Sequence, residues 1–403
     1  MPKLASQVQC TGCTACESYC STKSIDMVKD QYGFRYPQID SNSCIECGMC
    51  GRVCPVLNSL KVDGQCCNAY AAYALTSILR RESSSGGIFS VLAESILDSS
   101  GVVYGASYDE VGIVQHIRVD ILKDLQKLRG AKYSQSKLEG CFLDIKTDLE
   151  TGKNVLFSGM PCQVAGLKSF LRKEYVNLFC VDFVCHGVPS PMVWEKYIQY
   201  RADADNDGVL PEHINLRCKE SGWSRYSYSV DFQYSSGKRY CRKNNEDPFM
   251  RLFVNDYILR ESCSDCQFKG TERVSDITLG DFWGIWDVAP EMDDNKGTSL
   301  VLIHSLKGER LLDSIMDKIK LQTVTMEQAC QENPSLLCSS VHKSERKEVL
   351  DLIANDNFQG AASLMMPKTE DKREFVTKTK KFIRNILNLS LIHISEPTRH
   401  LRI

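Results

Sequence analysis

Two runs of cysteines near the N-terminus constrain this 403-residue chain more than any other feature. Residues 10–20 read CTGCTACESYC, and residues 44–54 read CIECGMCGRVC. Both runs space their four cysteines at intervals of three, three and four, so the second repeats the first after 34 residues. A cubane 4Fe-4S cluster needs three thiolates from one tight loop and a fourth from elsewhere in the chain. The repeat therefore predicts two such clusters.

The runs closely resemble those of two-cluster bacterial ferredoxins, in which the last cysteine of each run binds the other cluster. The resemblance implies one ligand set of Cys10, Cys13, Cys16 and Cys54, and a second set of Cys44, Cys47, Cys50 and Cys20. Ser21 departs from the pattern, because a proline often follows the fourth cysteine, as Pro55 does in the second run. Zinc is the alternative, since Cys-x-x-Cys pairs also bind it. Zinc pairs, however, do not require two copies of a four-cysteine run.

Composition limits where the protein is expected in the cell and which partners it can bind. The chain has 20 cysteines, and without an apolar signal sequence or a long apolar run we expect it in the reducing cytoplasm, where metal ligation is more common than disulfides. Its 49 basic and 51 acidic residues give no net basic field, so we expect no nucleic-acid partner.

Beyond residue 60 the hydrophobic pattern predicts a second, larger domain at 68–345, of mixed α/β (α+β) class. Strands followed by helices are expected twice, at 154–159 into 161–173 and at 177–185 into 190–201, which implies parallel strands with crossover helices. Further predictions are strands or hairpins at 69–75, 101–120, 227–241, 275–286 and 298–305, and helices at 88–99, 121–128 and 247–260.

Four more cysteines occupy positions that suggest a third site. Cys162 and Cys185 follow the two adjacent parallel strands, at the edge where open α/β sheets bind ligands. Cys263 and Cys266 form a CSDC motif that the predicted helix 247–260 would deliver. Four thiolates from three segments can hold a third 4Fe-4S cluster, with zinc, a redox dithiol or no metal as alternatives. We also expect Cys162 to begin a helix, whose N-terminal dipole favours the thiolate.

Several longer motifs carry a family resemblance. The segments SSSGGIFSVLAESIL, LRGAKYSQS, LFSGMPCQVAGLKSFL, VDFVCHGVPSP and CSDCQFKGTERVSDITLGDFWGIW resemble, in order and spacing, the β subunits of coenzyme F-420 hydrogenase and F-420-linked formate dehydrogenase. The resemblance implies a flavin-binding domain with FAD as cofactor. Matched by position, the implied flavin contacts are Ser85, Gly86, Gly87, Lys132 and Tyr133, while Asp281 and Trp283 either border the cofactor or pack in the core.

The resemblance also implies a function: an iron-sulfur flavoprotein oxidoreductase that moves electrons between 4Fe-4S clusters and FAD, and on to deazaflavin coenzyme F-420 or another soluble acceptor. A redox partner protein or ferredoxin is the expected partner, with electron flow in either direction. The alternative is an electron-transfer subunit without its own substrate site, serving a partner enzyme, for example in polysaccharide biosynthesis.

Three boundaries complete the expected organisation. The ferredoxin-type domain covers 1–60, a C-terminal helical tail covers 346–388, and 389–403 is expected to be non-native sequence. Within the tail, lysines alternate with apolar residues over 369–387, which predicts a basic amphipathic helix that docks on its own domain or on a partner.

Overall fold

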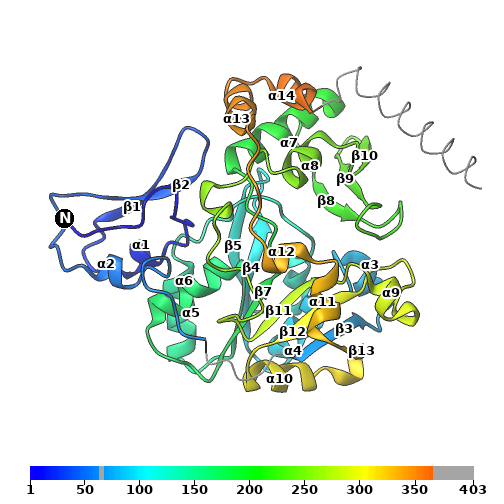
Figure 1. The fold of residues 1–403 in the computed structure, drawn as a ribbon, viewed down its shortest axis with the longest axis horizontal. Coiled ribbons are helices and arrows are strands. Elements are labelled where there is room, and N and C mark those ends of the chain that lie inside the picture. The colour runs from blue at the N-terminus through cyan, green and yellow to red at the C-terminus, as the bar shows by residue number, and fades with distance from the viewer. Residues whose placement is uncertain (63–67, 366–403) are drawn as a thin grey trace, which may run out of the picture.

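The computed structural model, described here for residues 1–62 and 68–365, is built around one eight-stranded sheet (Figure 1). Its strand order is β13-β3-β12-β11-β7-β6-β4-β5. The central strands β4, β6, β7 and β11 run parallel, and every other pairing is antiparallel. The mixed α/β class predicted from the sequence is confirmed. The strands are β3 (Asn68–Ala74), β4 (Val102–Tyr108), β5 (Val114–Val119), β6 (Val155–Ser158), β7 (Leu178–Phe183), β11 (Ile277–Asp281), β12 (Ser299–Ile303) and β13 (Ile319–Val324).

Helices cover both faces of this sheet, because each strand alternates its apolar side chains between them. On β4, Val103 joins the core under α4 (Ile88–Asp98) and α10 (Leu306–Asp313). Its neighbours Val102 and Tyr104 point the other way, into the core under α5 (Cys141–Glu150) and α6 (Pro161–Leu171). The remaining helices around the sheet are α3 (Ser77–Glu82), α9 (Ile285–Val288), α11 (Met326–Gln331) and α12 (Pro334–Leu337), with 3-10 turns η1 (Leu122–Leu128), η3 (Pro290–Met292) and η4 (Met316–Lys318).

A second layer, here called the cap, lies above the carboxyl ends of the parallel strands in Figure 1. It has its own aromatic-rich core and a three-stranded antiparallel sheet of order β10-β9-β8, which confirms the hairpin predicted at 227–241. Its elements are β8 (His213–Cys218), β9 (Ser229–Gln233), β10 (Arg239–Lys243), α7 (Pro191–Asn206), α8 (Pro248–Val254), α13 (Arg346–Ala354) and α14 (Phe358–Leu364).

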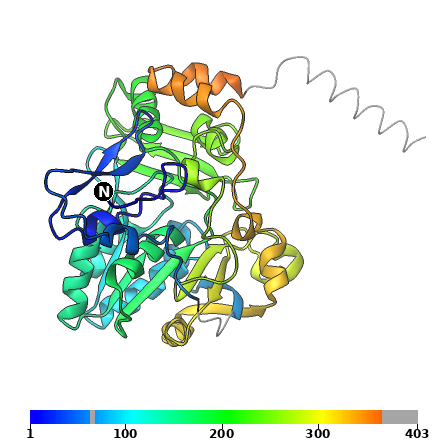
Figure 2. The same ribbon diagram turned by 60° about the vertical axis from the view of Figure 1, so that its left-hand side comes forward.

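The first 62 residues form a small module against the outer helices of the sheet (Figure 2). Its elements are α1 (Ala15–Tyr19), β1 (Ile25–Lys29), β2 (Arg35–Ile39) and α2 (Met49–Arg52). Cys13, Ala15 and Val53 are buried in the same core as α5 and α6. The module therefore shares part of its hydrophobic core with the body.

Several sequence predictions differ from the structure. The helix expected over 190–201 continues to Asn206, and the helix expected over 121–128 is a 3-10 helix. The helix expected over 247–260 ends at Val254, because Asn255 turns its side chain back to the Arg251 carbonyl and Asp256 takes a left-handed φ of 66°. The CSDC motif therefore follows a turn and a short 3-10 helix, η2 (Glu261–Cys263), rather than a long helix. The strand expected over 275–286 ends at Asp281, and its last residues enter α9.

No helix in the described ranges combines the length and apolarity that a bilayer crossing demands. The amphipathic helix predicted over 369–387 and the segment 389–403 lie outside the described residues.

Candidate functional site

The two cysteine runs of the N-terminal module adopt the same backbone conformation. Gly12 and Thr14 have left-handed φ values of 69° and 64°, and their counterparts 34 residues later, Glu46 and Gly48, have values of 54° and 71°. Each pair leads directly into a short helix, α1 or α2. Left-handed backbone is strained for threonine and glutamate, and such strain is typical of functional loops. The sequence repeat is thus also a repeat of loop structure.

The first cysteine group converges on one small cavity. Cys10, Cys13, Cys16 and Cys54 all line it, together with the surrounding loop. Burial, together with smaller contributions from the neighbouring Cys10 and Cys54, raises the pKa of the Cys13 thiol to about 12. The pKa of Cys16 is likewise raised by burial and by the thiols of the other three cysteines. The crossing of Cys54 to the first run, predicted from the repeat, is therefore compatible with this arrangement.

The second group is closer to the surface. Burial raises the pKa of Cys50, with smaller contributions from Cys47 and Cys44, and Cys47 is exposed. Cys20 lies in a pocket of polar contacts: its Sγ accepts the Ser24 amide at 3.3 Å and lies 3.5 Å from Thr22 Oγ1. Although burial raises its pKa, these hydrogen bonds lower it overall. That Cys20 completes the second group stays a prediction.

The four remaining candidate cysteines come together at the carboxyl edge of the main sheet. Cys162 is the second residue of α6, Cys185 follows β7, and Cys263 and Cys266 come from the turn after α8. Their mutual influence is visible at Cys162, where burial raises the pKa and Cys266, Cys185 and Cys263 raise it further. The Val188 amide donates to Cys263 Sγ at 3.4 Å, and Lys269 Nζ donates to the Cys185 carbonyl.

Burial reverses one expectation for this group. Cys162 occupies the predicted helix N-terminus, but the pKa of its thiol is well above the ordinary value rather than depressed. Desolvation penalises the buried thiolate more than the helix dipole favours it. The same cause raises the pKa of Cys185 to about 11, despite Lys269, and that of Cys263 to about 12, despite Arg260. These thiols need a bound cation to become thiolates.

Within the described residues, no three His, Cys, Asp or Glu side chains converge tightly enough to hold a single metal ion. A four-iron cubane is larger than one ion and holds its thiolates further apart. All four cysteines of the first group line one small cavity, which is the donor set that such a cluster requires.

The first and third cysteine groups are in contact through a glycine. A Cβ added to Gly166 would lie 2.8 Å from Cys13 Cβ and 3.0 Å from Cys13 Sγ. Gly166 stands one helical turn after Cys162 on α6, a rise of about 6 Å. Cys13 also contributes to the raised pKa of Cys162. The absence of a side chain at Gly166 is thus what brings the two groups together.

A cavity of about 680 Å³ lies between the sheet edge and the cap. This volume is in the range of small-molecule and cofactor sites. Cys162 and Cys185 form part of its wall, so the third cysteine group borders it directly. Of the predicted flavin contacts, the cavity is lined by Ser85, Gly87, Lys132 and Tyr133. Asp281 and Trp283 line it as well.

Gly86 does not line the cavity, unlike its neighbours Ser85 and Gly87. Its amide donates to Ser299 Oγ at 3.0 Å, and an added Cβ would lie 2.5 Å from the Ala72 carbonyl oxygen. The glycine is required by close packing against β3 and β12, and its amide already has a partner.

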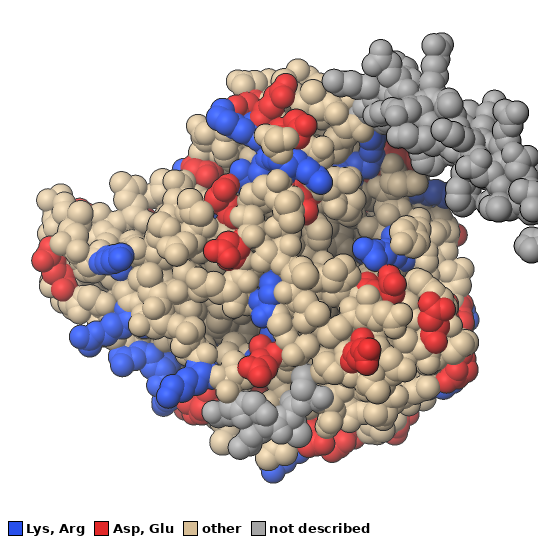
Figure 3. Space-filling view, in the orientation of Figure 1, with Lys and Arg blue, Asp and Glu red and all other residues tan. Residues whose placement is uncertain are grey.

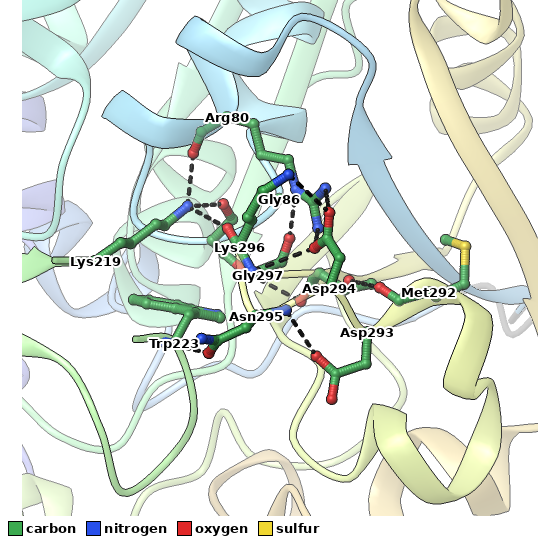
Figure 4. A network of polar contacts seen from close by, with 12 residues as sticks. Arg80, Gly86, Lys219, Trp223, Met292, Asp293, Asp294, Asn295, Lys296 and Gly297 are labelled. Carbon is green, nitrogen blue, oxygen red and sulfur yellow. Dashed lines mark hydrogen bonds and ion pairs between the residues drawn. The ribbon is translucent and has the colours of Figure 1, made fainter. Parts of the chain in front are cut away.

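The loop around Gly86 is held by a polar network (Figure 4). Arg80 makes a two-pronged ion pair with Asp294, at 2.6 and 2.8 Å, and also donates to the Gly297 carbonyl. Lys219, from the cap, donates to the carbonyls of Arg80, Ser85 and Lys296. The network thereby ties the cap to the loop that lines the cavity.

Among the predicted cofactor contacts, Lys132 has the largest shift in pKa. Its Nζ donates to the carbonyls of Arg129 at 2.6 Å and Gly130 at 3.1 Å. Desolvation in the cavity wall lowers its pKa to about 7. A small change of surroundings can therefore switch its charge near neutral pH.

Several polar groups on the cavity wall have no hydrogen-bond partner within the described chain. Among them are Arg217 Nε, His116 Nδ1 and Asn244 Oδ1. Burial lowers the pKa of His116 to about 4, so the ring is neutral, and its Nε2 lies 2.9 Å from the Ser158 carbonyl. If Nε2 donates there, Nδ1 is left as an unpartnered acceptor in a residue of the cavity wall. Buried polar atoms of this kind are normally satisfied, which indicates a ligand.

The sequence reasoning did not identify Arg217, His116 or Asn244. Arg217 stacks on Trp223 and Tyr228, donates to Asp281 at 2.7 Å, and comes from β8 in the cap. No local motif marks these residues, since the cap strand and the sheet edge meet only in the folded chain.

Two ranges of the chain match known protein families. Residues 152–329 match the family described as the C terminus of the beta subunit of coenzyme F420 hydrogenase/dehydrogenase, and residues 9–58 match a 4Fe-4S dicluster domain. A solved chain from the xenon-derivatized F420-reducing NiFe hydrogenase complex of Methanosarcina barkeri is 14% identical, with a TM-score of 0.45 over 74% of this chain and 90% of that chain. No curated protein sequence matches.

The two family matches indicate an iron-sulfur electron-transfer protein related to the oxidoreductases. More specifically, the chain carries the C-terminal domain of the coenzyme F420 hydrogenase/dehydrogenase β-subunit family behind an N-terminal 4Fe-4S dicluster domain.

Proposed function

We propose that this protein is an iron-sulfur flavoprotein that carries electrons through three 4Fe-4S clusters to an FAD bound in the 680 Å³ cavity. The observation that carries the proposal is the sequence of contacts from module to cavity. Cys13 packs on Gly166, one turn from Cys162, and Cys162 itself lines the cavity. Such contacts favour electron flow between the module and the cavity over a purely structural role for the metals.

The proposed ligands are the three cysteine groups described above. The first is Cys10, Cys13, Cys16 and Cys54, the second is Cys44, Cys47, Cys50 and Cys20, and the third is Cys162, Cys185, Cys263 and Cys266. Each bound cluster would transfer single electrons. The exposure of Cys47 makes the second group the entry point for a redox partner protein or ferredoxin.

The cavity suits FAD by its size and by its unpartnered polar atoms. Bound there, FAD would exchange a hydride with a soluble acceptor, such as a deazaflavin, while taking electrons one at a time. Lys132 and Arg217 would oppose negative charge on the cofactor, and His116 Nδ1 would accept a hydrogen bond from it. The cap would shield the site from water, and Asp281 of the main sheet would hold Arg217 in place.

Anaerobic purification with iron, acid-labile sulfide and flavin quantitation tests this proposal. We expect about twelve irons per chain, four for each cluster, and one FAD. About eight irons would remove the third cluster, and a colourless zinc-containing protein without labile sulfide would refute the proposal.

A second assay separates the enzyme from a subunit that only relays electrons, which the β-subunit family also suggests. The purified chain should oxidise a reduced deazaflavin or NADH on its own when supplied with an artificial one-electron acceptor. Turnover only after a partner protein is added would favour the relay.

A further inference from the structure

We propose that Arg260 is a positioning residue shared by the first and third clusters, and that its buried positive charge raises the reduction potentials of both. The inference rests on the proposed function, because it assumes that the first and third cysteine groups hold clusters. It goes beyond that function by assigning a role to a residue that binds neither metal nor flavin.

The backbone of Arg260 connects the residue to the third cysteine group. Its amide donates to the Val188 carbonyl at 2.9 Å, three residues beyond Cys185. Its own carbonyl accepts the Cys263 amide at 3.0 Å, at the start of the turn that delivers Cys263 and Cys266. Any movement of Arg260 therefore moves the segment that carries two ligands of the third group.

The side chain of Arg260 reaches in the opposite direction, into the N-terminal module. Nε donates to the Cys10 carbonyl at 2.8 Å, and Nη2 donates to the Arg35 carbonyl at 2.9 Å. The guanidinium also lies 4.2 Å from the centre of the Tyr36 ring. The arginine thus links a residue of the first cysteine group with the turn of the third.

Gln135 completes the connection. Its Oε1 accepts from Arg260 Nη1 at 2.8 Å, while its Nε2 donates to the Thr11 carbonyl at 3.0 Å. Gln135 belongs to the GAKYSQS motif and also lines the large cavity. One hydrogen-bonded unit therefore touches the module, the third group and the cofactor cavity.

The charge of Arg260 requires a counter-charge. The side chain is 1% exposed, and within the described residues it contacts only neutral oxygens and aromatic rings. An arginine stays protonated in proteins, and burying a charge without an opposite charge is costly. Thiolate-ligated clusters on either side, next to Cys10 and Cys263, would supply that negative charge.

A consequence for the potentials follows. Reduction adds one negative charge to a cluster, and a buried cation nearby stabilises the reduced form more than the oxidised form. Cluster net charge and surrounding hydrogen bonds are known determinants of iron-sulfur potentials. The second group, Cys44, Cys47 and Cys50, lies in a separate loop that Arg260 does not contact, so its cluster should respond least.

The experiment is a redox titration monitored by EPR, carried out on the full chain under anaerobic conditions. It compares wild type with Arg260→Gln, Arg260→Lys and the control variant Arg242→Gln. Arg242 is an exposed arginine on β10, where solvent screens its charge. A Cys263→Ala/Cys266→Ala chain identifies the signal of the third cluster. Arg260→Gln removes the charge and should lower the midpoint potentials of the first and third clusters by at least about 59 mV. For one electron this corresponds to a tenfold change in the reduction equilibrium.

Arg260→Lys retains the charge and should keep both midpoints closer to wild type than Arg260→Gln does, with Arg242→Gln unchanged. If Arg260→Gln loses its clusters, the lysine variant decides: clusters retained at near-native potentials support the proposal. Unchanged midpoints in Arg260→Gln, or equal losses in the lysine and glutamine variants, would overturn it. A wild-type chain without iron-sulfur signals would instead mean that the proposed function has failed.

Discussion

The N-terminal module and the sheet-edge cysteine group collect their thiols in opposite ways. In the module, each loop of seven residues supplies three cysteines, and left-handed backbone at Gly12 and Gly48 wraps the chain around them. At the sheet edge, three segments more than 20 residues apart each bring one or two cysteines, held by β6, β7 and the turn after α8. The first arrangement depends on local spacing, whereas the second depends on a packed scaffold.

This difference has a consequence for stability. Much of the described module is exposed, and its buried residues Cys13, Ala15 and Val53 belong to a core shared with α5 and α6. Small domains with little core of their own gain folding free energy from their metals. The main sheet is covered by helices on both faces and does not need the third cluster for its core.

The largest predicted effect is on iron content, and it follows from the different dependence of the module and the main sheet on bound metal. Cys13→Ala/Cys16→Ala should remove both N-terminal clusters, about eight irons, because the two runs share ligands and the module has little other support. Cys263→Ala/Cys266→Ala should remove only about four irons and leave the circular dichroism spectrum of the body unchanged. Iron analysis and circular dichroism on both variants provide the measurement.

The matched control replaces Cys330 and Cys338, two cysteines outside all three groups, with alanine. This variant should keep the wild-type iron content. Equal iron loss from the module variant and the sheet-edge variant would contradict the comparison, as would unfolding of the body after loss of Cys263 and Cys266.

The contact between the two regions can be tested at Gly166. Alanine normally stabilises a helix interior by about 1 kcal/mol relative to glycine. Here an added Cβ would lie 2.8 Å from Cys13 Cβ, and overpacking of this kind costs about 1–3 kcal/mol. The net cost is then up to about 2 kcal/mol, so Gly166→Ala should release iron to a chelator faster, by up to about thirtyfold.

Lys146→Ala on the exposed face of α5 is the control for this measurement, and its iron release should match wild type. Iron release from Gly166→Ala that is as slow as wild type would mean that the module tolerates displacement from α6.

The smallest predicted effect concerns the cavity. The pKa of Lys132 is about 7 without a ligand, so the amine is mostly protonated below pH 7 and mostly neutral above it. An anionic cofactor favours the protonated form. FAD affinity should therefore be greatest below pH 7 and fall as pH rises, by at most tenfold per pH unit for a single proton.

Fluorescence titration of FAD into flavin-depleted protein between pH 6 and 9 measures this effect. Lys132→Arg keeps its charge throughout this range and should bind FAD with little pH dependence. Lys132→Met should bind FAD more weakly, and its affinity should also depend little on pH. A wild-type pH slope that survives in Lys132→Met would exclude Lys132 as the group responsible.

Much of the scaffold was predictable because its signals are local. The cysteine repeat, the two strand-helix units and the hairpin at 227–241 all follow from spacing or periodicity within short segments. Parallel pairing of β6 with β7 then places Cys162 and Cys185 at one edge. The early end of α8 was not predicted, because it depends on polar contacts of Asn255 and Asp256 rather than on hydrophobic periodicity.

The distribution of charge on the molecule was less predictable. Figure 3 shows basic and acidic side chains interspersed over the visible face, as the near-neutral composition suggests. The important cations are instead buried. Arg217 and Arg260 are both buried. Each lies over an aromatic ring from a distant part of the sequence, Trp283 for Arg217 and Tyr36 for Arg260.

The sequence by itself determined which atoms can bind iron and which strands bring two of the thiols to one edge, since both depend on short-range spacing and on the alternation of side chains along strands. Only the tertiary structure decided that Cys13 contacts the helix of Cys162, that burial keeps the free thiols protonated, and that Arg260 lies between two cysteine groups. These properties depend on desolvation and on contacts between segments far apart in the chain, which no local pattern encodes.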